Sequence, residues 1–218
     1  MRISHLFILL AASAMLTACD FLDEYNPNSV TVGNYYTSEE DIVASLNGVY
    51  TSLTQSYVAD NYHYFTDVRA NATVVTNSGA NSGIPYQFYN YTLTEENVYV
   101  YNRYSQLYKI ISRANTLFAH LGDVSYATPS ARDTYEAEAR FLRALSYYWL
   151  VTEWGDVPLV LKVLESTEEV RANNYRRPKA EIYQAIFDDL KYVTESPLLD
   201  VQPASACGST CRAMLRPA

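Results

Sequence analysis

The chain has 218 residues and a formal net charge of −8, from 24 acidic and 16 basic side chains. Nucleic-acid binding and electrostatic adhesion to anionic lipid both need clustered lysine and arginine, so this acidic chain without basic clusters is a poor candidate for either. Its length suits one domain or a piece of a larger protein. Tyrosine is unusually frequent, with 21 residues against 7 phenylalanines and 2 tryptophans. Because a phenol has an apolar face and a polar tip, a tyrosine-rich surface suits binding to sugars or to other proteins.

The first predicted element is a lipoprotein signal peptide over residues 1–18. A basic residue, Arg2, precedes an apolar run that is too short to span a bilayer. The run ends in the lipobox Leu-Thr-Ala-Cys, in which the thiol of Cys19 takes a diacylglyceryl group and cleavage frees an amine for acylation. We therefore expect a mature chain that begins at Cys19, is anchored to a membrane by its acyl chains and lies outside the cytoplasm. An acidic, turn-prone tether follows over residues 19–38.

The first helix is predicted over residues 39–55. Ser38 at the N-cap and Asp41 three residues later form a capping-box-like pair, and the acidic first turn suits the positive end of the helix dipole. Apolar residues follow at spacings of four, three and four, which gives the helix one apolar face. These residues are Ile42, Leu46, Val49 and Leu53.

Residues 57–94 are predicted to form a long loop insertion. Asparagine, glycine, serine and tyrosine dominate this stretch, and a loop of this length is usually functional or disordered. Its many tyrosines argue against plain disorder.

Three further helices are predicted, over residues 95–121, over residues 129–154 and after Pro178. The second half of the middle one is apolar nearly all round, so this helix needs packing partners on more than one side. Its first half carries Glu136 and Arg140 at the spacing of an ion pair. With no alternating strand pattern, the chain is predicted to be all-α and built from layered helix pairs.

Enzyme chemistry has little support in the sequence. The four carboxylate doublets are chain neighbours, which point about 100° apart on a helix and make poor acid–base pairs. His63 and His120 have no partner at ligand spacing, and the chain has neither a nucleophile elbow nor a phosphate-binding glycine loop. A secreted glycoside hydrolase stays open as the enzyme alternative, because its two carboxylates can be distant in sequence.

Several stretches, taken in order along the chain, together resemble the SusD/RagB family of outer-membrane lipoproteins. The most specific is Glu-Ala-Arg-Phe-Leu-Arg-Ala at residues 138–144. It overlaps Ala137, Phe141 and Ala144, whose spacing fits the second-helix half of a tetratricopeptide repeat, although the first-helix half does not match. The resemblance extends from the lipobox to about residue 197. The other matching stretches are residues 19–23, 35–41, 47–50, 107–115, 154–159 and 182–190.

This resemblance implies a tetratricopeptide-like scaffold of helical pairs over residues 39–198, with the long loop as an insertion. It implies a lipid-anchored protein of the outer membrane that faces the exterior, binds oligosaccharide or another nutrient, and delivers it to a SusC-like TonB-dependent transporter. It implies that the protein is not an enzyme, and the residues themselves suggest no cofactor and no metal site. Within repeat-packing motifs of this kind, Arg140 and Arg143 are expected to hold neighbouring helices through ion pairs.

Family members are more than twice as long as this chain, so we expect it to be truncated. The ending, residues 199–218, is atypical for the family, and we expect it to be a disordered tail in which Cys207 and Cys211 could pair. The alternative is therefore that the chain is a non-functional fragment of a SusD-like protein.

The ligand-binding residues are expected in the insertion, because in SusD-like proteins the loop between the first two helices contributes aromatic and polar contacts to sugar. The alternative is that its tyrosines simply pin the loop to the scaffold. The candidate residues are Asp67, Arg69, Tyr86, Tyr89 and Tyr91.

Overall fold

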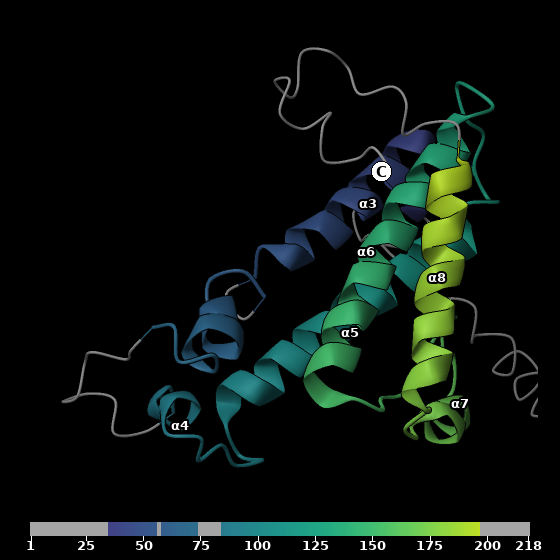
Figure 1. Cartoon of the computed structure of the whole chain (residues 1–218). Helices are drawn as coiled ribbons and strands as arrows, with labels where there is room; N and C mark the ends of the chain where they lie inside the picture. The colour runs from purple at the N-terminus through teal and green to yellow at the C-terminus, as the bar shows by residue number, and fades with distance from the viewer. Residues whose placement is uncertain (1–34, 56–57, 74–83, 197–218) are drawn as a thin grey trace, which may run out of the picture. The chain divides into compact units, whose positions relative to one another are not determined.

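The computed structural model describes residues 35–55, 58–73 and 84–196 (Figure 1). The chain divides into two units, Met1–Tyr35 and Tyr36–Ala218, and every element below belongs to the second. The predicted signal peptide, the lipidation site Cys19, most of the tether and the tail over residues 199–218 lie outside the described residues.

The described residues form helices, as the all-α prediction requires, and the tetratricopeptide-like fold class is confirmed. No helix in residues 35–55, 58–73 or 84–196 combines the length and apolar character needed to cross a bilayer. The elements in chain order are α3 (Glu39–Leu53), the π-helix η2 (Tyr64–Val68), α4 (Tyr86–Tyr89), α5 (Val98–His120), α6 (Ala131–Trp154), α7 (Thr167–Asn173) and α8 (Lys179–Glu195).

The four long helices, α3, α5, α6 and α8, match the predicted ones to within a few residues at each end. The capping box at α3 is confirmed, because the Ser38 side chain accepts from the Asp41 N–H while Asp41 accepts from the Ser38 N–H at 2.9 Å. Helix α5 begins slightly later than predicted, because the Asn97 side chain caps it by accepting from the backbone of Tyr99 and Val100. Gly155, at φ 74°, ends α6.

Helix α6 packs against α3, α5 and α8, so it is covered on several sides as its sequence predicts (Figure 1). The apolar residues of these four helices form the main core. Its most buried members include Ile42, Leu107, Ile110, Leu142, Tyr147, Leu150 and Ile182.

A buried ionic cluster, the α6–α8 clamp, joins these two helices. Arg143, only 5% exposed, donates to both carboxylate oxygens of Asp189 at 2.8 and 2.7 Å. Arg140 donates to Asp189 at 2.8 Å and to Glu136 at 2.6 Å. Asn115 of α5 accepts from Arg143 at 2.7 Å, which ties a third helix to the cluster. The predicted role of the two arginines in holding helices together is confirmed.

The insertion contains more regular structure than its sequence suggests. Helices η2 and α4 pack on each other around a second small core of Phe65, Val68 and Phe88. Phe65 and Phe88 meet edge to face with ring centroids 4.9 Å apart, and Phe65 also lies 6.4 Å from the ring of Trp154 at the end of α6. The described part of the insertion is therefore anchored beside the C-terminal end of α6.

Candidate functional site

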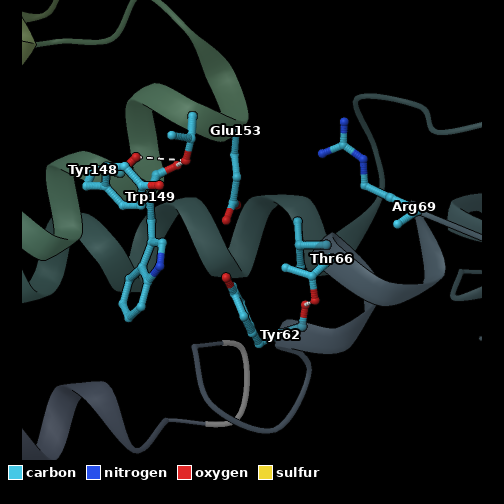
Figure 2. A pocket seen from close by; sticks show the side chains of 9 residues that line it. Tyr62, Thr66, Arg69, Tyr148, Trp149 and Glu153 are labelled. Carbon is cyan, nitrogen blue, oxygen red and sulfur yellow. Dashed lines mark hydrogen bonds between the residues drawn. The ribbon is translucent and has the colours of Figure 1, made fainter. Parts of the chain in front are cut away.

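A hollow of about 410 Å³ lies between the insertion and the last turns of α6 (Figure 2). This volume falls within the range of about 300–1,000 Å³ that is typical of small-molecule sites. The residues that line the hollow are Tyr62, Phe65, Thr66, Arg69, Ala70, Tyr148, Trp149, Thr152 and Glu153.

Helical spacing explains why these residues share one hollow. On α6, residues 148, 149, 152 and 153 lie on one side of the helix over about one and a half turns, and this side faces the insertion. Around η2, residues 62, 65, 66 and 69 repeat at spacings of three, one and three, so one side of this short segment faces α6. Burial of Phe65 in the second core fixes that segment in place.

Arg103 of α5 lies behind the lining of the hollow and contacts four of the residues that line it. Arg103 is fully buried. Its Nε and Nη2 donate to the two carboxylate oxygens of Glu153 at 2.7 and 2.6 Å. Two parallel charge-assisted bonds of this kind are among the strongest hydrogen bonds in proteins and fix both groups in orientation. Arg103 also donates to the Val58 carbonyl at 3.3 Å.

The same guanidinium lies against aromatic rings from both walls of the hollow. Its central carbon is 4.9 Å from the ring centroid of Tyr62, 4.8 Å from that of Phe65 and 5.5 Å from that of Trp149. Cation–π contacts of this kind are attractive and strengthen when the cation is desolvated. Arg103 therefore fixes the insertion to α5 and α6 and sets the positions of the aromatic walls.

The aromatic walls remain open to solvent. Tyr62 is 37% exposed and Tyr148 is 49% exposed, and the rings of Tyr62 and Trp149 lie 6.0 Å apart at 47°. Figure 2 shows Tyr148 and Trp149 on one side of the hollow and Arg69 on the other, with Glu153, Tyr62 and Thr66 between them. Rings with polar tips can pack against the C–H faces of a polar ligand and hydrogen-bond to its hydroxyls.

The structure brings only part of the predicted ligand set to this hollow. Of the five candidates, all of them described, Arg69 alone lines it. Asp67 is exposed on η2, and Tyr86 and Tyr89 lie on α4 with ring centroids 5.6 Å apart.

Tyr91 lies just beyond α4 and contacts the segment that carries Arg69. Its hydroxyl donates to the Arg69 carbonyl at 2.8 Å. Tyr89 packs against the second core. Both contacts are those expected if these tyrosines hold the insertion in place, which is the alternative to ligand binding. The ligand-binding role of the five residues stays a prediction.

Sequence reasoning missed most residues of the hollow. Tyr148 and Trp149 belong to a run that is apolar all round, so they resemble core residues, and Arg103 and Glu153 are 50 positions apart on different helices. The available signal was the clustering of aromatic residues at the end of a long helix next to a tyrosine-rich insertion.

Metal ligands do not gather in the described part of the chain, where no three His, Cys, Asp or Glu side chains come together. His120 instead pairs with Asp123 at 2.7 Å near the end of α5. A metal site is therefore not identified among residues 35–55, 58–73 and 84–196.

A scan against protein families matches residues 20–199 to a SusD-like family described as "Starch-binding associating with outer membrane". The match covers most of the chain, which therefore belongs to this family. The predicted SusD/RagB membership is confirmed.

Curated relatives agree with this assignment. A SusD-like protein of Formosa agariphila is 27% identical over 195 residues, which are 89% of this chain and 37% of the relative. A SusD-like protein of Bacteroides ovatus is 25% identical over 207 residues, which are 88% of this chain and 35% of the relative. The chain thus spans about a third of the length of the curated relatives it matches.

Solved structures show the same fold. A structure described as a laminarin-binding SusD-like protein is 28% identical, with a TM-score of 0.60 over 72% of this chain and 34% of its own. A SusD homologue from Bacteroides thetaiotaomicron is 25% identical, with a TM-score of 0.62 over 76% of this chain and 31% of its own.

Proposed function

We propose that this protein is a surface-exposed outer-membrane lipoprotein that binds oligosaccharide in the hollow and delivers it to a SusC-like TonB-dependent transporter, without catalysing a reaction. Family membership and the similarity to a laminarin-binding protein support the ligand class. The predicted acylation of Cys19 supports the anchor, and it rests on the lipobox in the sequence.

The observation that carries the proposal is a hollow with aromatic walls, in which rings from both walls contact the buried Arg103. Tyr148 and Trp149 come from a rigid helix, and the contacts of Arg103 hold Tyr62 opposite them. Sites whose walls are fixed before binding lose less side-chain entropy when the ligand arrives. Asp67, Tyr86 and Tyr89 are retained in this proposal as candidates for contacts to sugar units that extend beyond the hollow.

Calorimetric titration with laminarin and xyloglucan oligosaccharides, followed by a wider glycan array, tests ligand binding. Tyr148→Ala removes a half-exposed ring from the wall, and an aromatic contact worth about 1 kcal/mol corresponds to roughly fivefold weaker binding. Phe187→Ala is the matched control, because Phe187 is 62% exposed on α8 and does not line the hollow. Equal affinity of both variants would remove the hollow from the proposal.

The alternatives give different results in the same assay. An inactive fragment would release no heat with any glycan, although its circular dichroism would be helical. A glycoside hydrolase would release new reducing ends during long incubation with polysaccharide, whereas a binding protein would not.

Anchoring and delivery need cellular experiments. Metabolic labelling with a fatty-acid probe should mark the wild-type protein and leave Cys19→Ala unmarked. Affinity purification from a native host should recover a TonB-dependent transporter with the wild-type protein. An unlabelled wild-type protein would contradict the anchor.

A further inference from the structure

The hollow carries one positive charge that the described residues do not neutralise. Glu153 uses both carboxylate oxygens on Arg103, so this pair adds no net charge. The remaining charged side chain in the wall is Arg69, which is exposed and has no ion pair within the described part of the chain. This local excess of positive charge occurs in a chain whose net charge is −8.

The backbone that carries Arg69 is held from both sides. Its N–H donates to the Thr66 carbonyl, and its own carbonyl accepts from the Tyr91 hydroxyl at 2.8 Å. Two residues later, Asn71 adopts a left-handed conformation at φ 57°, and the Ala72 N–H donates to the Asp67 carbonyl at 2.8 Å. The chain therefore turns sharply at Asn71, just after Arg69, whose side chain lies at the edge of the hollow (Figure 2).

Tyr91 itself has an uncommon backbone conformation. Its φ is 57°, which is rare for a bulky residue and persists only where surrounding contacts hold it. Here the contacts are its hydroxyl bond to Arg69 and the bond from the Thr92 N–H to the Gln87 carbonyl at 3.0 Å. Such strain tends to occur at ligand-binding segments, because it fixes a group in an orientation that a relaxed loop would not keep.

We propose that the hollow selects a sugar unit with an anionic substituent, a carboxylate or a sulfate ester, which binds to Arg69 while the ring packs on Tyr148 and Trp149. This inference rests on the proposed glycan-binding function and names its ligand class. The planar guanidinium forms paired hydrogen bonds with carboxylate or sulfate oxygens, and Arg69 is free to do so because Arg103 alone neutralises Glu153. Tyr91 acts as a positioning residue for Arg69.

Calorimetric titration with matched oligosaccharides tests the charge preference. Oligogalacturonides are compared with their methyl esters, and sulfated galactan oligosaccharides with their desulfated forms, so the two arms separate carboxylate from sulfate. The charged member of at least one pair should bind about tenfold or more tightly, and added salt should reduce its advantage.

Two substitutions of Arg69 assign that preference to its side chain. Arg69→Gln should reduce the affinity for the charged sugar to that for its neutral partner, and Arg69→Lys should restore part of the difference because lysine keeps the charge without the planar fork. Arg171→Gln is the matched control, because Arg171 is an exposed arginine of α7, outside the hollow, and its replacement changes the net charge by the same amount. The control should leave the charged-to-neutral affinity ratio unchanged.

Tyr91→Phe tests the positioning role through the same ratio. Loss of the hydroxyl should weaken binding of the charged sugar more than that of the neutral one. Equal weakening of both would assign Tyr91 a purely structural role and overturn that part of the inference.

The outcomes separate the inference from the function on which it rests. Neutral sugars bound as tightly as charged ones, with Tyr148→Ala still weakening them, would overturn the inference and leave the proposed function intact. A charge preference that survives Arg69→Gln would overturn the assignment to Arg69. Absence of binding to every glycan would contradict the proposed function as well, and circular dichroism of each variant shows whether it is folded.

Discussion

Two buried arginines, Arg143 and Arg103, use the same chemistry for different purposes. Each donates two short bonds to one carboxylate on a neighbouring helix, and each lies over at least one aromatic ring. The side chain of Asp189, the partner of Arg143, is only 3% exposed, so that cluster is closed inside the scaffold. The rings around Arg103 reach the surface, since Tyr62 is 37% exposed. The first cluster is closed and acts as a clamp between helices, whereas the second supports the exposed aromatic lining of a candidate binding site.

The clamp should be the more sensitive of the two to loss of its arginine. Arg143→Met leaves Asp189 buried with one bond from Arg140, so the free energy of unfolding should fall by about 3 kcal/mol. Urea unfolding followed by circular dichroism measures this loss. The double variant Arg143→Met, Asp189→Leu should recover much of it, because a buried pair replaced by apolar side chains leaves no charge uncompensated.

An exposed arginine of the same helix gives the control for this prediction. Arg132 is 45% exposed and pairs with Asp133 and Glu136 at 3.2 and 3.3 Å. Arg132→Gln should change the free energy of unfolding by less than about 1 kcal/mol. Comparable losses from Arg132→Gln and Arg143→Met would contradict the distinction between buried and exposed pairs.

Replacement of the other buried arginine should affect both stability and binding. Arg103→Met removes both bonds to Glu153, but the Glu153 side chain is 11% exposed and can be partly rehydrated, so we expect a smaller loss of about 2 kcal/mol. Because Tyr62 and Trp149 lose the cation that contacts both rings, glycan affinity should also fall about tenfold or more. Urea unfolding and calorimetric titration of one protein preparation measure the two effects.

The pattern across the two arginine variants sharpens the comparison. Arg143→Met should keep the glycan affinity of the wild type at temperatures where it is folded, whereas Arg103→Met should not. Wild-type affinity in folded Arg103→Met would show that the hollow is not the glycan site.

The difference between the clamp and the hollow also explains what the sequence could predict. Periodicity locates helices, so the faces of α3, α5, α6 and α8 follow from their apolar spacing, and Arg140 and Arg143 lie in a recognisable packing motif. Helix α7 was not predicted, because its seven residues include no buried side chain and therefore no apolar stripe. The capping box at Ser38 was predictable because both of its partners lie within four residues.

The hollow depends on contacts that periodicity does not contain. The sequence places Arg103 on a helix. Its bond to Glu153, 50 positions later, depends on how α5 and α6 pack against each other, which periodicity does not specify. The insertion was predicted as a long loop, and its second core forms because Phe65 and Phe88 reach each other only after the intervening chain turns back. Arg69 was identified because it lies in a polar, tyrosine-rich stretch. Trp149 was missed because it resembles a core residue.

Loss of the contacts made by a partly exposed carboxylate, Glu39 at the start of α3, should give the smallest effect. Glu39 accepts from the Ala127 N–H at 2.7 Å and from the Tyr135 hydroxyl at 2.8 Å. The bond from Ala127, followed by that from Tyr135, lowers the pKa of Glu39 below its usual 4.5, although partial desolvation opposes them. Burial, followed by the bond to Glu39, raises the pKa of Tyr135 to about 12, so the phenol keeps its proton at neutral pH.

A carboxylate whose pKa is lowered by folding stabilises the protein fully above its unfolded pKa and loses that contribution as the pH falls through its folded pKa. Glu39→Gln should therefore lower Tm by about 1 °C at pH 7, and the difference from the wild type should shrink as the pH drops from 4.5 towards 3. Thermal unfolding measured at several pH values tests this. Glu95→Gln, at an exposed glutamate in the turn before α5, should leave the pH dependence unchanged. A difference between wild type and Glu39→Gln that grows below pH 4.5 would show that these bonds do not favour the charged carboxylate of Glu39.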